Sequence, residues 1–207
     1  MRSKERRTVA SLSRVFFRRL SSMSKSALVI LAEGAEEMEA VISIDVLRRG
    51  GVNVCVAGLT GADPVQCSRG VIVKPDKPLS AAAAEGPYDV VVLPGGAKGA
   101  KSLADSAEVG KILKDQEQSG RIVAAICAAP IALHSHKIGA GKSVTSHPSV
   151  KEQLKGYQYS EERVVQDNNL ITSRGPGTAF EFALKLVEVL HGSNKKEEII
   201  PPMLLKL

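Results

Sequence analysis

Three segments with chemically useful residues each follow a short apolar run of the sequence. Cys127 directly follows RIVAAI. Gly95 and Gly96 follow YDVVVL and one proline, and the acidic segment Glu33–Glu39 follows ALVILA. In open parallel sheets, ligand sites lie beyond the carboxyl ends of the strands. If the three runs are neighbouring strands, a thiol, a pair of backbone amides and a carboxylate converge in one crevice.

The segment around Cys127 has the pattern of a nucleophile elbow, a sharp turn between a strand and a helix. Ala128 and Ala129 are small residues behind the cysteine, and Pro130 suits the start of a helix. Such a turn holds its central side chain on strained backbone. The free amides and the helix dipole there lower the pKa of a thiol. The sequence therefore predicts a reactive cysteine, and a buried structural cysteine is the alternative.

Two further side chains are candidates for moving protons near Cys127. Glu39 can turn back beneath the thiol, where repulsion between two anions favours a protonated carboxyl that donates a hydrogen bond to sulfur. Glu36 and Glu37 are expected mainly to complement the dipole of the same helix. His147, in the segment SHP after a short strand, is the best candidate for a general base.

The spacing of residues in the sequence disfavours two kinds of ligand, a metal ion and a nucleotide phosphate. The histidines and carboxylates lack metal-ligand spacing, so we expect no metal site and no cofactor. Gly95–Ser102 (GGAKGAKS) resembles a phosphate-binding loop, but Ala100 replaces its second required glycine, and no later strand supplies a magnesium ligand. A glycine-rich turn whose amides face Cys127 is the better interpretation.

Short apolar runs alternate with longer amphipathic segments along residues 25–207, which we interpret as a single domain. The expected strands are residues 27–32, 52–58, 88–93, 121–126, 143–146, 163–166 and 170–172. The expected helices are residues 36–49, 98–104, 106–119, 128–136 and 177–190, and a hairpin is expected over 66–74. Apolar strands separated by helices predict an α/β sandwich with a mostly parallel central sheet. Cys55 then lies in a strand as inert core, and Cys67 lies in the hairpin, with its exposure and role open.

Residues 1–24 are interpreted as a basic leader that precedes the domain. Eight Lys and Arg residues and one acid fall within residues 1–25, which accounts for essentially all of the net charge of +6. This composition is typical of a mitochondrial transit segment. The alternative is an inert or disordered tail.

The composition of the rest of the chain limits its partners and location. The chain is 3% aromatic without Trp, and its body is nearly neutral, which disfavours nucleic acid as the main partner. No apolar run approaches the roughly 18 residues of a membrane span. Three cysteines fit a reducing compartment better than a disulfide framework. We expect a cytoplasmic protein, with a mitochondrial fraction through the leader and a nuclear fraction left open.

Six segments, in order along the chain, resemble the parkinsonism-associated deglycase (DJ-one) family of the ThiJ/PfpI superfamily. They are GAEEMEAV, VAGLTGADPVQCSRGV, EGPYDVVVLPGG, AAICAAPIAL, SVTSHP and LITSRGPGTAFEFAL. The similarity spans about residues 25–192. It implies a flavodoxin-like three-layer sandwich and a homodimer. It also implies that Cys127 is the nucleophile and the oxidation-sensitive cysteine, and that Glu39 hydrogen-bonds to it.

The same resemblance implies a set of residues around the thiol. The pocket residues are Gly95, Gly96, Ala128, Arg49, Arg69 and Pro176, the last three at or near the dimer interface. The amides of Gly96 and Ala128 would polarise a bound oxyanion, and His147 would lie nearby. Ala128 stands where the protease-like branch of the superfamily has a histidine, so peptidase activity is not expected.

These residues predict a cysteine-dependent glyoxalase or protein deglycase with a protective role in oxidative stress. The substrates would be methylglyoxal, glyoxal and their early adducts on amines. Cys127 would attack the carbonyl carbon, the two amides would hold the oxyanion, and Glu39 or His147 would move protons to give lactate or glycolate. The alternative is a redox-sensing, chaperone-like dimer in which Cys127 is oxidised to sulfinate as a signal.

Overall fold

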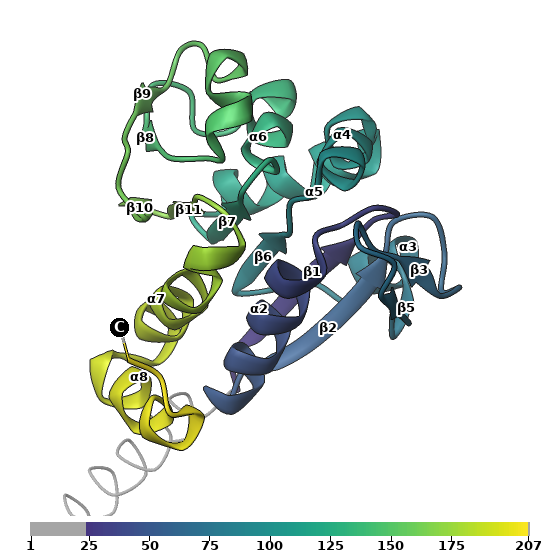
Figure 1. Cartoon of the computed structure of the whole chain (residues 1–207). Coiled ribbons are helices and arrows are strands. Elements are labelled where there is room, and N and C mark those ends of the chain that lie inside the picture. Colours follow the sequence, from purple (N-terminus) through teal and green to yellow (C-terminus); the bar gives the residue numbers. More distant parts are fainter. Residues whose placement is uncertain (1–23, 207) are drawn as a thin grey trace, which may run out of the picture.

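A central sheet of seven strands organises the chain, in the order β10-β11-β7-β6-β1-β2-β5 (Figure 1). The computed structural model describes residues 24–206, so the predicted leader lies outside the described residues. The strands are β1 (Ser26–Leu31), β2 (Asn53–Gly58), β5 (Lys77–Pro78), β6 (Val90–Leu93), β7 (Ile122–Ile126), β10 (Val164–Asp167) and β11 (Leu170–Ser173). Every neighbouring pair is parallel except β10 with β11. The predicted mostly parallel sheet is confirmed.

Helices cover both faces of this sheet and make a three-layer sandwich (Figure 1). One face carries α2 (Glu37–Arg49), α7 (Ala179–His191) and α8 (Ser193–Ile199). The other carries α3 (Leu79–Ala84), α5 (Ala107–Gln118) and α6 (Pro130–His136), and α4 (Ala97–Asp105) follows the carboxyl end of β6. Among residues 24–206, no helix combines the length and apolarity needed to cross a bilayer.

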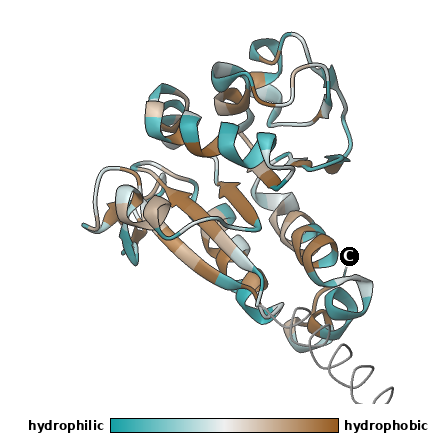
Figure 2. Cartoon of the chain, turned by 180° about the vertical axis from the view of Figure 1, so that it is seen from behind, coloured by the Kyte–Doolittle hydropathy of each residue, from teal (hydrophilic) through white to brown (hydrophobic). Residues whose placement is uncertain are grey.

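The alternation of side chains along β1 explains why both faces are covered. Val29 and Leu31 pack in a core with residues of α2 and α7, whereas Leu28 and Ile30 pack in a second core with residues of α5 and α6. Successive side chains of a strand point to opposite faces, so an unbroken apolar strand needs a helical layer on each side. Figure 2 shows the apolar central strands between these layers.

The structure differs from the sequence-based elements mainly in short segments. No helix was predicted between the hairpin and β6, but Pro78 precedes α3, because its fixed φ of −68° suits a helix start. β8 (Ser143–Val144) pairs with β9 (Gln158–Tyr159) in a small separate sheet. The predicted hairpin is present as β3 (Val65–Gln66) and β4 (Ile72–Val73). Cys67 within it is buried, with 4% of its surface exposed.

The C-terminal helix α8, which the sequence analysis missed, is joined to α7 by one carboxylate. Glu188 accepts from Lys185 at 2.5 Å and from Lys196 at 3.0 Å. These two ammonium groups lower the pKa of Glu188 to about 2. Since Lys196 is on α8 and the other two residues are on α7, the cluster links the two helices.

Replacing Glu188 by glutamine is expected to cost about 1 kcal/mol of stability and to loosen α8, because the pairs lose their charge. A lowered carboxyl pKa stabilises the fold above the unfolded value of 4.5, and this stability is lost as the pH falls towards 2. Hydrogen exchange of the amides of residues 193–199 measures the loosening. Glu198→Gln, at an exposed position of α8 that pairs with Lys195, is the control. Equal exchange rates of these amides in Glu188→Gln and Glu198→Gln would contradict the prediction.

Candidate active site

The three strands that precede the candidate residues are neighbours in the sheet. β7, β6 and β1 are adjacent, so their carboxyl ends meet at one edge. There the Gly95 amide donates to Glu39 Oε2 at 2.8 Å. A Cβ built on Gly95 would lie 2.6 Å from Cys127 Cβ and 2.7 Å from Glu39 Oε2. The structure therefore brings the thiol, the carboxyl and the glycine turn into direct contact.

Cys127 occupies a strained turn between β7 and α6. Its φ of 66° lies in the left-handed region that non-glycine residues rarely adopt. Hydrogen bonds hold this conformation from both sides: the Cys127 amide donates to the Ser173 carbonyl at 2.9 Å, and the His147 amide donates to the Cys127 carbonyl at 2.8 Å. Such strain persists only where the surroundings impose it. The predicted elbow geometry is present, with 9% of the cysteine exposed.

The electrostatic surroundings of the sulfur oppose the predicted lowering of its pKa. Burial, followed by the negative charge of Glu39 and the hydrogen bond with it, raises the pKa of the Cys127 thiol to about 12. The amides of Gly96 and Ala128 act in the opposite direction, because they face the sulfur and favour its anion. While Glu39 is ionised, the expectation of a resting thiolate is therefore wrong. The sequence could not reveal how deeply the thiol is buried against an acid.

Glu39 is the matching half of this pair. Burial raises its pKa to about 7, although its contacts with Cys127 and the Gly95 amide favour the carboxylate. Its Oε1 atom is buried without a hydrogen-bond partner among the described residues. With a pKa of about 7, Glu39 is ionised in about half of the molecules at neutral pH, and the ionised carboxylate can accept the thiol proton when sulfur attacks.

The turn after β6 packs tightly rather than forming a phosphate cradle. Gly96 has a φ of +85°, and a Cβ there would lie 2.3 Å from the Gly34 carbonyl oxygen. A Cβ on Gly99 would lie 3.0 Å from the backbone of Ala35. Glycine at these positions lets the turn approach the loop after β1. This packing supports a glycine-rich turn whose Gly96 amide faces Cys127, and it does not support a phosphate-binding loop.

His147 lies beside the elbow through its backbone amide, and the loop before Pro176 lies beside the ring of His147. The His147 ring forms a hydrogen bond with Ser149 Oγ at 2.8 Å. Within residues 24–206, no hydrogen bond joins this ring to the Cys127 thiol. A Cβ on Gly175 would lie 3.7 Å from His147 Cδ2, so the loop that leads to Pro176 packs beside the imidazole. His147 is thus close to Cys127 but is not aimed at it.

The two arginines occupy different places. Arg69 is exposed on the hairpin beside the N-terminus of α2, where its amide donates to Glu37 Oε1 at 2.7 Å. Arg49 pairs with Asp45 at 2.6 Å in the last turn of α2. Ten residues separate Arg49 from Glu39, which is about 15 Å along a helix. One chain therefore does not bring Arg49 to the thiol.

Sequence analysis did not predict the hydrogen-bonding roles of three supporting residues. Glu36 caps α2 by accepting from the Glu39 amide at 2.8 Å, and Glu37 holds the hairpin by accepting from Ser68 Oγ at 2.7 Å. Thr178 Oγ1 bonds Ser173 Oγ at 2.6 Å and thereby steadies the strand end that holds Cys127. An acid at the cap position was the only sequence signal for any of them.

The fold and the site together define an α/β sandwich with a cysteine on a strand-to-helix elbow. The model of the DJ-1/PfpI family matches residues 25–189, which is most of the chain. The chain belongs to the DJ-1/PfpI family.

Curated relatives and solved structures agree with this assignment. The Parkinson disease protein 7 homolog of Danio rerio is 55% identical over 88% of this chain and 98% of its own length. The glutathione-independent glyoxalase DJR-1.2 of Caenorhabditis elegans is 43% identical over 87% of this chain and 97% of its own. The crystal structure of Drosophila melanogaster DJ-1beta superposes with a TM-score of 0.87 at 53% identity, covering 89% of this chain and all of that one. The flavodoxin-like arrangement implied by the resemblance is confirmed.

Proposed function

We propose that this protein is a cysteine-dependent glyoxalase and deglycase that acts on methylglyoxal, glyoxal and their early adducts on amines. The observation that carries the proposal is the contact of the Cys127 thiol with Glu39, a carboxyl whose pKa lies at about 7. The relative from Caenorhabditis elegans that is named a glyoxalase supports the same class of substrate. A protective role in oxidative stress belongs to this proposal.

The proposed reaction begins with proton transfer within the pair. Cys127 Sγ bonds to the aldehyde carbon while its proton moves to ionised Glu39, which avoids a free buried thiolate. The amides of Gly96 and Ala128 face the sulfur and are placed to stabilise the oxyanion that forms beside it. The C–H bond of the former aldehyde carbon then breaks and a C–H bond forms at the adjacent carbonyl carbon, so the first carbon is oxidised to a thioester and the second is reduced to an alcohol. Water releases the acid from sulfur, so methylglyoxal plus water gives lactate with no outside oxidant.

Removal of the thiol tests the proposal. Cys127→Ala should lower lactate release from methylglyoxal, and amine release from its adducts, to the background rate, because no other group forms the sulfur–carbon bond. The matched control is Cys67→Ala, a change at a cysteine that is also buried but lies in the hairpin. Turnover that survives Cys127→Ala in a folded protein would eliminate the mechanism.

A redox-sensing, chaperone-like role is the second candidate. It is favoured by the same two amides and Glu39 around the sulfur, since these groups would hold the oxygens of a sulfinate. A solved relative, described as oxidized Toxoplasma gondii DJ-1, is 39% identical with a TM-score of 0.84, covering 89% of this chain and all of that one. Peroxide would be the oxidant, and Cys127 the residue oxidised.

The proposed state is a homodimer in the cytoplasm, with a mitochondrial fraction that depends on the leader. Exposed Met38 and Val41 on α2 support a dimer face, with 52% and 46% of their surfaces accessible. Such a dimer is the arrangement through which Arg49 of one copy would reach the site of the other. Small dicarbonyls or glycated amines are the proposed partners, and nucleic acid is not the main one.

A further inference from the structure

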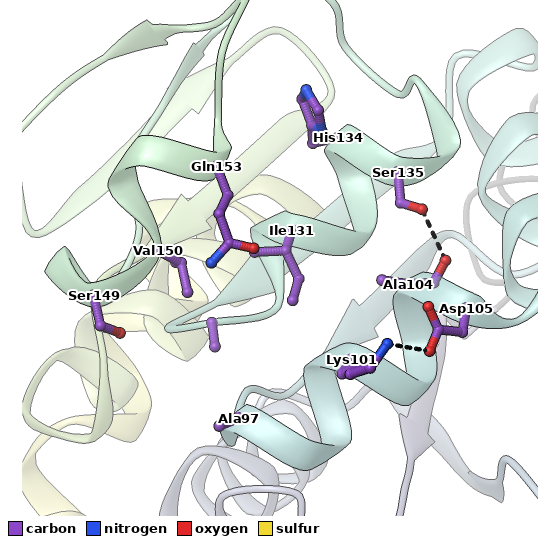
Figure 3. Close-up of a pocket in the computed structure, with 11 residues that line it drawn as sticks. Ala97, Lys101, Ala104, Asp105, Ile131, His134, Ser135, Ser149, Val150 and Gln153 are labelled. Carbon is purple, nitrogen blue, oxygen red and sulfur yellow. Dashed lines mark hydrogen bonds and ion pairs between the residues drawn. The ribbon is translucent and has the colours of Figure 1, made fainter.

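A groove of about 470 Å³ lies between α4, α6 and the 3-10 turn at Pro148–Gln153 (Figure 3). Two of its lining residues are sequence neighbours of the proposed reaction centre. Ala97, which lines it, follows Gly96, and Ala128, which also lines it, follows Cys127. Since the Ala128 amide faces the sulfur, Ala128 belongs both to the proposed oxyanion site and to the groove, and a group attached to the reacting carbon would extend into the groove there.

The groove is far larger than the free dicarbonyls need. Methylglyoxal has five non-hydrogen atoms, which take at most about 150 Å³ even if each occupies as much space as a water molecule in the liquid. The volume of about 470 Å³ therefore leaves room for a larger group attached to the reacting carbon. Free methylglyoxal would leave most of it filled with water.

The chemistry of the walls fits polypeptide rather than nucleic acid. Lys101 on α4 is paired with Asp105 at 2.8 Å, so this wall contributes no net charge. Gln153 and Ser149 supply hydrogen-bonding groups on the opposite wall, and Ile131 supplies apolar surface between them (Figure 3). Amide, hydroxyl and apolar groups suit a peptide backbone and its side chains. A polyanion would require cations that are not already paired.

We infer that this groove is the subsite for the polypeptide that carries a dicarbonyl adduct, and that it selects protein adducts over adducts on other carriers. The inference rests on the proposed function of Cys127. It adds a binding surface that the reaction on free methylglyoxal does not use.

Filling the groove tests the inference. Ala104 is half-buried on α4 and lines the groove, so Ala104→Trp should block the carrier without touching the thiol. We expect kcat/KM to fall at least tenfold for a methylglyoxal-treated lysine peptide and to change less than twofold for free methylglyoxal. Ala107→Trp, the same change at an exposed position of α5 outside the groove, should change neither.

Binding supplies a second readout that needs no turnover. The affinity of Cys127→Ala for the treated peptide should fall when Ala104→Trp is added. Gln153→Ala, at an exposed position that tolerates truncation, should weaken the same binding a few-fold if Ala104→Trp does not fold.

Three outcomes would overturn the inference. The first is an equal loss of kcat/KM in Ala104→Trp for the treated peptide and for free methylglyoxal. The second is a loss of kcat/KM for a glyoxal-treated nucleotide as large as the loss for the peptide. The third is an unchanged affinity for the peptide in both groove variants. Failure of the proposed function looks different: Cys127→Ala would retain turnover of free methylglyoxal, whatever the groove variants do.

Discussion

Glu39→Gln is expected to stabilise the protein by about 3 kcal/mol above pH 7 while abolishing turnover. Burial raises the pKa of Glu39 to about 7 from 4.5, and each unit corresponds to about 1.4 kcal/mol. A raised carboxyl pKa means that the folded state prefers the neutral acid. Wild-type stability should therefore decline from pH 4.5 to pH 7, whereas the neutral amide has no such decline. Turnover should fall at least 100-fold, because the proton acceptor is gone.

Denaturant unfolding from pH 4.5 to 8.5 measures this difference. The gain of the variant over wild type should be near zero at pH 4.5 and should reach its plateau above pH 7. Exposed Glu108→Gln on α5 is the control. A gain that does not vary with pH would contradict the buried-acid account. Mass spectrometry after graded peroxide completes the test: a changed extent of Cys127 oxidation favours the sensor, and loss of turnover alone favours the enzyme.

Gly95→Ala should cost at least about 2 kcal/mol of stability and about 100-fold in turnover. The added Cβ would lie 2.6 Å from Cys127 Cβ and 2.9 Å from the Ile126 carbonyl oxygen. Neither atom can move without shifting the elbow, so the change overpacks the site. A displacement of about 1 Å between sulfur and the bound carbonyl is sufficient for such a loss of rate.

Gly177→Ala is the matched control for this prediction. A Cβ on Gly177 has no neighbour within 4 Å, and no unusual φ opposes it. Its stability should stay within about 0.5 kcal/mol of wild type. Thermal unfolding and lactate assays of both variants decide the matter. A Gly95→Ala protein as stable and active as the Gly177→Ala protein would show that the turn adapts.

Much of the fold could be predicted because each long element has a local signal. The apolar run of β1 and the helical spacing of α2 are visible in sequence, and both boundaries were placed within one residue. The convergence of Glu39, Gly95 and Cys127 followed from a general rule about strand ends. Short elements such as α3 and β9 had no such signal, since tertiary contacts rather than periodicity determine them.

The electrostatics of the site could not be predicted in the same way. The direction of the Cys127 pKa depends on how far the thiol is buried and on whether Glu39 carries charge, and neither follows from spacing. The position of Arg49 relative to the thiol depends on assembly. The bond between Ser173 and Thr178 links residues that only the folded loop brings together.

The order of strands in the sheet also has a kinetic consequence. The site joins the ends of β1, β6 and β7, whose pairings link Ala27 to Val90, 63 positions apart, and Val90 to Ile122, 32 positions apart. Parallel pairings of such separation form slowly, because loop closure precedes the gain from contact. Until they form, Cys127 is an ordinary cysteine in water. A newly made chain would thus bring Cys127 against Glu39 only on completing its sheet, and until then the thiol keeps the pKa of a free cysteine.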